Sequence, residues 1–127
     1  MLDHTGITVT DFARSRDFYT KALAPLRYRL VKQKGAAAGF GVTEGYGKSP
    51  DPAGDFWIFK GTPQQPRVHV AFSAASRAEV EAFHAAALAA GGTCNGRPGL
   101  RPQYHKNYYG AFVLDPDGYN IEAVHHL

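Results

Sequence analysis

The feature that most limits the fold of this chain is an internal repeat. When the 127-residue sequence is shifted by 65 positions against itself, similar residues of the two halves coincide. The matched pairs are His4 with His69, Ile7 with Phe72, Ala13 with Ala78, Phe18 with Phe83, Ala22 with Ala87 and Leu23 with Leu88, and the same shift places Trp57 on Glu122. Because the apolar matches follow a strand pattern and one side of a helix, they indicate a duplicated structural unit.

Both halves predict the order strand, helix, strand, strand, strand. In the first half we expect strands over 2–10, 28–34, 37–42 and 55–60, and a helix that begins after Asp11 and ends at Pro25. In the second half we expect strands over 67–73, 93–97, 108–114 and 121–125, and a helix from Ser76 to about residue 90. The prediction is one α+β domain over 1–127, made of two paired βαβββ modules (1–60 and 67–127) joined by a linker over 61–66. A Gly- and Pro-rich segment, 43–54, is expected to be a mobile loop.

Composition excludes several classes of protein. No apolar run approaches the ~18 residues of a spanning helix, so no membrane association is expected. The start of the sequence lacks the features of a signal peptide, and a single cysteine, Cys94, excludes a disulfide-stapled fold, so we expect a cytoplasmic protein. The net charge of +3 comes without a basic run, which argues against nucleic-acid binding and leaves small substrates, including anionic ones.

Three residues that can bind metals are predicted to lie on strand faces that do not pack against the helices. Side chains alternate along a strand, so His4 lies opposite Ile7, and His69 lies opposite Val70. Glu122 lies opposite Ile121 in the same way. Alone, each of these residues is typical of a solvated or hydrogen-bonded side chain. Together, two imidazoles and one carboxylate suit a divalent metal ion and leave coordination positions open, as a catalytic site requires.

Three segments of the sequence carry a family resemblance. LDHTGITVTDFARSRDFYTKAL, RVHVAF and YYGAFVLDPDGYNIEAV resemble the vicinal oxygen chelate superfamily, which includes glyoxalases, bleomycin-resistance proteins, fosfomycin-resistance enzymes and extradiol dioxygenases. The resemblance implies paired βαβββ modules whose curved mixed sheets surround a cleft. It also implies a homodimer, with one divalent metal (Fe²⁺, Mn²⁺, Zn²⁺, Ni²⁺ or Co²⁺) held by His4, His69 and Glu122. The chemistry it implies binds two neighbouring substrate oxygens to the metal, for a lyase, isomerase or ring-cleavage reaction.

The sequence departs from individual branches of that superfamily. Lactoylglutathione lyases generally have a fourth, carboxylate ligand where the repeat here places Trp57, and an indole cannot bind a metal ion. Fosfomycin-resistance enzymes have a serine-rich stretch where this chain has residues 102–107, PQYHKN. Typical extradiol dioxygenases carry four modules. The substrate, the identity of the metal, and the choice between lyase and dioxygenase therefore stay open.

Four further residues are candidates for the site. His105 is a candidate general acid or base and Tyr108 a hydroxyl donor, because imidazole exchanges protons near neutral pH. Trp57 and Tyr109 are candidates for contact with the substrate. Cys94 is expected to be a small buried residue rather than a nucleophile.

A second function is compatible with the same family. A metal-free protein of the bleomycin-resistance type would sequester a small aromatic or cationic molecule in an apolar cleft lined by Trp57, Phe59, Tyr108 and Tyr109. The His4, His69 and Glu122 set argues against this alternative, since sequestration needs no metal ligands. Whether the three ligands meet within one chain, or His4 of one chain meets His69 and Glu122 of another, also stays open.

Overall fold

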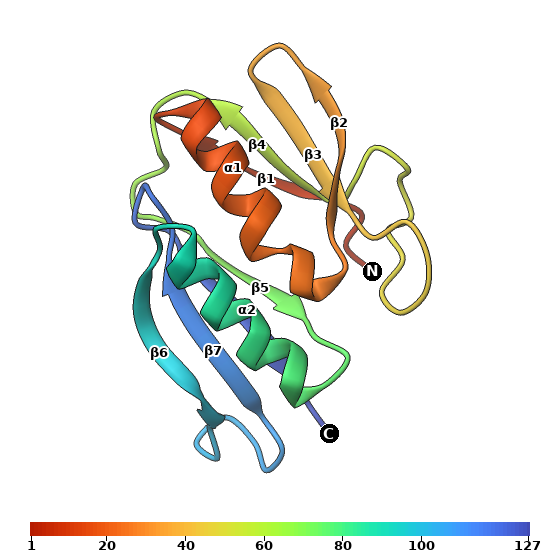
Figure 1. Ribbon diagram of the computed structural model, residues 1–127, viewed down its shortest axis with the longest axis vertical. Coiled ribbons are helices and arrows are strands. Elements are labelled where there is room, and N and C mark those ends of the chain that lie inside the picture. The colour runs from red at the N-terminus through yellow and green to blue at the C-terminus, as the bar shows by residue number, and fades with distance from the viewer.

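A computed structural model describes all residues 1–127 and shows the repeat as two similar modules (Figure 1). The first module consists of β1 (Thr5–Val9), α1 (Phe12–Ala22), a short 3₁₀ helix η1 (Ala24–Leu26), β2 (Arg29–Lys34), β3 (Ala37–Gly41) and β4 (Phe56–Lys60). The second consists of β5 (His69–Ser73), α2 (Arg77–Ala89), β6 (Thr93–Leu100), β7 (Tyr109–Leu114) and β8 (Asn120–His125). The predicted α+β fold of two βαβββ modules is confirmed.

Each module forms its own four-stranded mixed sheet. The strand orders are β1-β4-β3-β2 and β5-β8-β7-β6, and in each sheet the first strand runs parallel to the last while the other pairs are antiparallel. In the first sheet Gly6 pairs with Trp57, and in the second Ala71 pairs with Glu122. These two pairs are separated by the same shift of 65 residues as the sequence repeat, so the repeat extends to the register of the sheets.

Capping residues define where the two helices begin. The Asp11 side chain accepts a hydrogen bond from the Arg14 backbone N–H at 3.1 Å, and the Ser76 hydroxyl accepts one from Glu79 N–H at 3.1 Å. Such caps satisfy backbone donors that have no partner inside the helix. After α2 the chain turns at Gly91, whose φ of 103° disfavours residues with a side chain.

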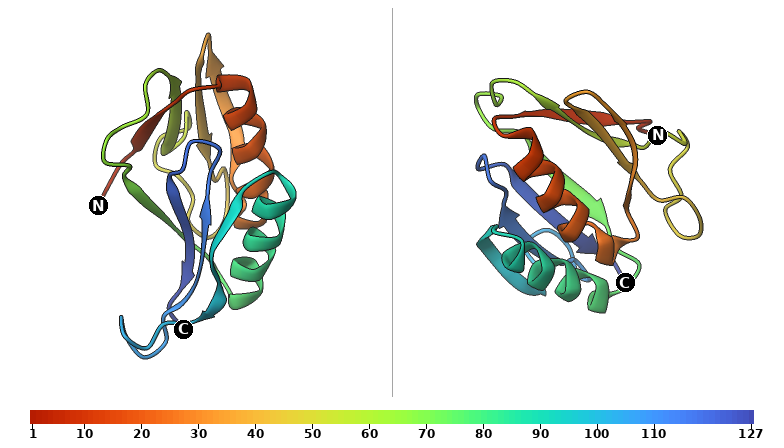
Figure 2. Two further views of the ribbon diagram at one scale, coloured as in Figure 1. Left: turned by 90° about the vertical axis from the view of Figure 1, so that its left-hand side faces the viewer. Right: turned by 45° about the horizontal axis from the view of Figure 1, so that its top comes forward.

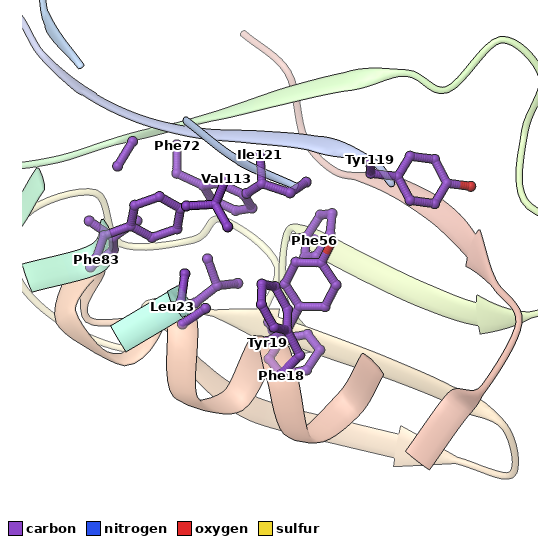
Figure 3. Close-up of a cluster of buried hydrophobic side chains, with 14 of the residues drawn as sticks. Phe18, Tyr19, Leu23, Phe56, Phe72, Phe83, Val113, Tyr119 and Ile121 are labelled. Carbon is purple, nitrogen blue, oxygen red and sulfur yellow. The ribbon is translucent and has the colours of Figure 1, made fainter. Parts of the chain in front are cut away.

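The two modules share one hydrophobic core. Both helices lie on the same side of the two sheets and next to each other (Figure 2). The buried face of each sheet and the inner sides of the helices contribute to one cluster of 21 buried residues, which includes Phe18, Tyr19, Phe56, Phe72 and Phe83 (Figure 3). The opposite faces of the sheets carry no helix, and His69 and Glu122 lie on that face of the second sheet.

Three segments differ from the prediction. β1 begins at Thr5, three residues later than expected, so His4 lies outside the strand. β6 extends to Leu100, three residues beyond the expected end, and its pairing with β7 is irregular around Gly96. The segment 43–54 packs on the first sheet: Ser49 is buried, accepts a hydrogen bond from Val42 N–H at 3.0 Å and donates to Asp55 at 2.8 Å. No helix is long and apolar enough to span a membrane.

Candidate metal centre on the open face of the second sheet

His69 and Glu122 meet on the open face of the second sheet. His69 begins β5 and Glu122 is the third residue of β8, and because these strands are neighbours, alternation directs both side chains to the same face. His69 Nε2 lies 2.9 Å from Glu122 Oε1. Strand alternation therefore accounts for both side chains lying on this face.

The imidazole of His69 has a defined orientation. Its Nδ1 lies 2.8 Å from the backbone carbonyl oxygen of Asn120. A carbonyl oxygen only accepts hydrogen bonds, so Nδ1 carries a proton and donates it. In a neutral ring the lone pair of Nε2 then points at the carboxylate of Glu122. Two electron-rich atoms at 2.9 Å need a shared cation, which is either a proton between them or a metal ion that lies to one side and binds both.

The donor set fits a divalent metal ion. With metal–ligand distances of about 2.0–2.2 Å, a nitrogen and an oxygen in adjacent coordination positions lie roughly 2.9–3.4 Å apart. The separation of Nε2 and Oε1 is 2.9 Å. Nδ1–H bonded to a backbone carbonyl is also the arrangement that usually orients a metal-binding histidine.

Glu122 is buried, and its second carboxylate oxygen has its own partner. The residue is 1% exposed, and the Tyr108 hydroxyl donates a hydrogen bond to Oε2. Gly110 makes room for this contact, because a Cβ there would lie 3.0 Å from Oε2 and 3.2 Å from the Tyr108 ring. Burial raises the pKa of Tyr108 and the hydrogen bond to Glu122 raises it further, so the phenol stays protonated and acts as a donor.

A surface cavity of about 400 Å³ opens over this pair. Its lining consists of His69, Tyr104, Tyr108, Phe112, Asn120 and Glu122. The Phe112 ring lies 6.0 Å from the imidazole of His69, and the Arg101 guanidinium lies 5.5 Å from the Phe112 ring centre. The cavity therefore combines two potential metal ligands with aromatic walls and a nearby positive charge.

His4 does not join His69 and Glu122 within the chain. It lies just before β1 and is exposed, and its Nδ1 lies 2.7 Å from Asp3 Oδ1. No three His, Cys, Asp or Glu side chains of a single chain are grouped so that they could hold a metal ion. One chain thus brings together two of the three predicted ligands.

The other candidate residues lie in different surroundings. The His105 ring lies 5.3 Å from the Tyr108 ring and its Nε2 lies 2.9 Å from Nδ1 of His126, so His105 is next to the cavity but does not line it. Tyr109 faces the helix side, where its hydroxyl donates to Glu81 at 2.6 Å. Trp57 lies on the first sheet, at the position equivalent to Glu122.

Three cavity residues, Tyr104, Phe112 and Asn120, are not among the predicted site residues, and one prediction was wrong. Phe112 and Asn120 line the cavity, and the alternation of Tyr108, Gly110 and Phe112 along one strand is the signal that could have revealed Phe112. Cys94 is exposed rather than buried, because β6 is an edge strand. Its sulfur lies 3.2 Å from His84 Nε2.

Comparison with known proteins agrees with this fold. The family model described as Glyoxalase/Bleomycin resistance protein/Dioxygenase superfamily matches residues 1–123. A solved structure of a glyoxalase/bleomycin resistance protein from Albidiferax ferrireducens T118 is 30% identical, with a TM-score of 0.79 and coverage of 98% of each chain. A comparison with curated proteins found no match.

More distant structures show the same fold. A glyoxalase/bleomycin resistance protein/dioxygenase family enzyme from Burkholderia phytofirmans PsJN has a TM-score of 0.72 at 18% identity, covering 99% of this chain and 98% of that one. A glyoxalase-related enzyme from Fulvimarina pelagi has a TM-score of 0.70 at 16% identity, covering 98% and 87%. Since the family match extends over nearly the whole chain, the protein belongs to the glyoxalase/bleomycin resistance protein/dioxygenase superfamily.

Proposed function

We propose that the protein is a metal-dependent enzyme that acts on a small molecule through two neighbouring oxygens. The metal would be held by His69 and Glu122 of one chain and by His4 of a second copy. The observation that carries this proposal is the 2.9 Å approach of His69 Nε2 to Glu122 Oε1, with Nδ1 of the same ring committed to the backbone carbonyl of Asn120.

The surroundings of Glu122 favour a metal ligand over an ordinary ion pair. A buried carboxylate is costly unless it is paired, and its partner His69 has a side chain that is 45% exposed, at the floor of an open cavity. Because the imidazole is exposed at the cavity, an ion could approach from the cavity side and bind both His69 Nε2 and Glu122 Oε1. A histidine and a carboxylate are ligands that several divalent transition metals accept, so the identity of the metal is not specified.

A second copy is the source of the third ligand in this proposal. His4 is exposed, and by alternation it shares the open face of the first sheet with Gly6 and Thr8. That face carries no helix, as is true of the face that bears His69. A symmetric dimer in which the open face of one first sheet lies against the second sheet of its partner would form two equivalent sites.

The bound metal would supply Lewis acidity, which lowers the energy of negative charge developing on substrate oxygens. The chain itself supplies orientation. The Asn120 carbonyl fixes the tautomer of His69, and the Tyr108 hydroxyl binds Oε2 of Glu122, so that Oε1 is the oxygen left beside His69 for a metal. His105, which lies next to Tyr108 at the edge of the cavity, is our candidate for proton exchange with a substrate. These roles fit lyase, isomerase or ring-cleavage chemistry.

Metal analysis of the purified protein tests the proposal. Protein prepared without chelators and incubated with Zn²⁺ or Mn²⁺ is expected to retain about one ion per chain after desalting. His4→Ala, His69→Ala and Glu122→Gln should each lose the ion while keeping the circular dichroism spectrum. Metal content that is unchanged in His69→Ala or Glu122→Gln would overturn the assignment. An absence of metal in the folded wild type would favour the metal-free binding protein instead.

Mixing two variants that do not bind metal tests whether the site is shared between two chains. In a dimer of one His4→Ala chain and one Glu122→Gln chain, one site carries both substitutions and the other carries neither. Unfolding and refolding a 1:1 mixture should therefore restore one ion per mixed dimer, whereas each variant refolded alone binds none. A site formed within one chain predicts no restoration. Mixing His69→Ala with Glu122→Gln is the matched control, because both substitutions affect the same half-site and no intact site can form.

A further inference from the structure

We infer that His105 and His126 form a second metal site, which binds a divalent transition-metal ion through two imidazole nitrogens. The inference is carried by the approach of His105 Nε2 to His126 Nδ1, which lie 2.9 Å apart. We call these two side chains the imidazole pair. Neither of them belongs to the set His4, His69 and Glu122, so the inference does not depend on the proposed function.

Hydrogen bonds of the second sheet bring the two histidines together. β8 ends at His125, whose Nδ1 lies 2.9 Å from the carbonyl oxygen of Ala74. His126 is the next residue, so it extends from an anchored position. His105 precedes β7 in a turn, and this turn is closed by a hydrogen bond of 3.3 Å from Tyr108 N–H to the His105 carbonyl oxygen. The backbone of both histidines is therefore held close to the same end of the sheet.

The Tyr108 ring supports both imidazoles. Its centre lies 5.3 Å from the centre of the His105 ring and 5.3 Å from the centre of the His126 ring, with interplanar angles of 73° and 80°. The centres of the two imidazoles lie 4.9 Å apart and their planes differ by 28°. A shared neighbour restricts the rotation of both rings, so less conformational freedom is lost when they bind an ion.

Neither imidazole of the pair is committed to another protein group. Ion pairs that involve histidine are confined to His4 and His69. The outer ring nitrogens, Nδ1 of His105 and Nε2 of His126, have no hydrogen-bond partner in the chain. Both residues are exposed, so water can carry a proton from one ring nitrogen to the other. Each ring can therefore hold its proton on the outer nitrogen and offer the lone pair of the inner nitrogen to an ion.

The separation of the inner nitrogens fits a metal ion. With metal–nitrogen distances of about 2.0–2.1 Å, two imidazoles in adjacent coordination positions have their nitrogens roughly 2.9–3.4 Å apart. One proton shared between the rings gives the same 2.9 Å distance, but an exposed hydrogen bond of this kind competes with water and contributes little. An ion that lies to one side of the two nitrogens uses both lone pairs and completes its coordination with water.

The imidazole pair is separate from His69 and Glu122. His126 follows Glu122 by four residues in the direction of β8, which places their Cα atoms roughly 13 Å apart. The chemistry differs as well, because two nitrogen ligands suit Ni²⁺, Cu²⁺ and Zn²⁺, whereas Mn²⁺ prefers oxygen ligands. Two ligands hold an ion more weakly than three do. The second ion is therefore expected to dissociate during desalting and to be detected only at equilibrium.

Calorimetric titration with Ni²⁺ tests the inference. The first site is removed with His69→Ala, so that binding to the imidazole pair is measured by itself. We expect the His69→Ala protein to bind one Ni²⁺ per chain, and the His69→Ala/His126→Ala protein to show no binding in the same concentration range. His69→Ala/His84→Ala is the matched control, because it also removes a second histidine but leaves the imidazole pair intact. It should bind Ni²⁺ as His69→Ala does.

Paramagnetic broadening identifies the ligands directly. Bound Ni²⁺ broadens the proton signals of the imidazoles that hold it, so the signals of His105 and His126 should disappear before those of the other histidines. Unchanged Ni²⁺ binding after His126→Ala, or earlier broadening of any other histidine, would overturn the inference. Folded His69→Ala protein that binds no Ni²⁺ would also overturn it, and this result would leave the proposed function intact.

Discussion

Trp57 and Glu122 occupy equivalent positions in the two modules. Trp57 is the second residue of β4 and pairs with Gly6 of the parallel strand β1. Glu122 is the third residue of β8 and pairs with Ala71 of the parallel strand β5. Both side chains point to the open face, but the side chain at this position is chemically different in the two modules. One module contributes a buried carboxylate and the other contributes an indole whose ring lies close to Gly39.

This division explains why the proposed site needs two copies of the chain. A ligand, His69, and its carboxylate partner lie together in the second module, whereas the repeat equivalent of His69 in the first module, His4, has no acidic partner on β4. The first module can contribute one imidazole and one indole. Neither module alone has a complete set of three ligands.

Removal of the Tyr108 hydroxyl should weaken metal binding. Tyr108→Phe frees Oε2 of the buried Glu122, so the carboxylate loses the partner that orients it. Loss of such an outer contact typically reduces metal affinity about 10- to 100-fold. Competition with a chromogenic chelator measures the change. Tyr104→Phe is the control, because Tyr104 lines the same cavity but has no hydrogen bond to Glu122, and its affinity should match the wild type.

Gly110→Ala should act on the same contact from the neighbouring strand. The added methyl group would lie 3.0 Å from Oε2 of Glu122 and 3.2 Å from the Tyr108 ring, which forces the two side chains apart. The affinity for metal should fall about as far as in Tyr108→Phe, and the double variant should be little worse than either single one. Additive losses would show that Gly110 acts by another route. Gly61→Ala, whose added carbon meets Thr8 at an ordinary 3.4 Å, is the matched control.

Strand alternation predicts on which face of the sheet each side chain of the site lies. His69 and Glu122 could be placed on the open face because β5 and β8 have a clean period of two. The same rule places Tyr108 and Tyr109 on opposite faces, so the expectation that both serve one site could not hold within a single chain. Tyr109 lies against Glu81 of α2, on the helix side.

Contacts that depend on sheet order or on glycines could not be predicted. Cys94 is exposed because β6 is an edge strand, and the local periodicity of a sequence does not predict the order of the strands in a sheet. The hydrogen bond from Tyr108 to Glu122 needs the space at Gly110, and the tilt of Trp57 needs the space at Gly39. These are tertiary relationships between residues on different strands.

A buried hydrogen bond between the modules should contribute to stability. The hydroxyl of Tyr19 in α1 donates to Asp115, which follows β7, and Tyr19 is fully buried. Burial raises the pKa of Asp115, and donation from Tyr19 acts in the opposite direction. Tyr19→Phe leaves this carboxylate with one donor fewer and should lower the free energy of unfolding by about 1–3 kcal/mol. Urea unfolding measures the effect. Tyr46→Phe, at an exposed hydroxyl, should change it by less than about 0.5 kcal/mol.

A second link between the modules should make stability depend on pH. Arg27 follows η1 and donates two hydrogen bonds to the carboxylate of Glu79 in α2, with Nε–Oε2 of 3.1 Å and Nη2–Oε1 of 2.9 Å. The hydrogen bond from Arg27 lowers the pKa of Glu79 in the folded protein. The unfolded chain therefore takes up its proton at a higher pH than the folded chain does. The stabilisation is complete above about pH 4.5 and is lost as the pH falls below it.

The variant Glu79→Gln isolates this contribution. At pH 7 we expect it to be less stable than the wild type by about 1–2 kcal/mol, because a neutral amide replaces the charged, two-point contact with Arg27. The difference should shrink as the pH falls from 5 toward 3, where the wild-type carboxylate also becomes neutral. Urea unfolding at a series of pH values measures this difference, and Glu44→Gln, at an exposed residue outside any ion pair, should show none. A difference that stays constant from pH 7 to pH 3 would mean that Glu79 stabilises the fold through packing or its hydrogen bond to Ala75 N–H rather than through its charge.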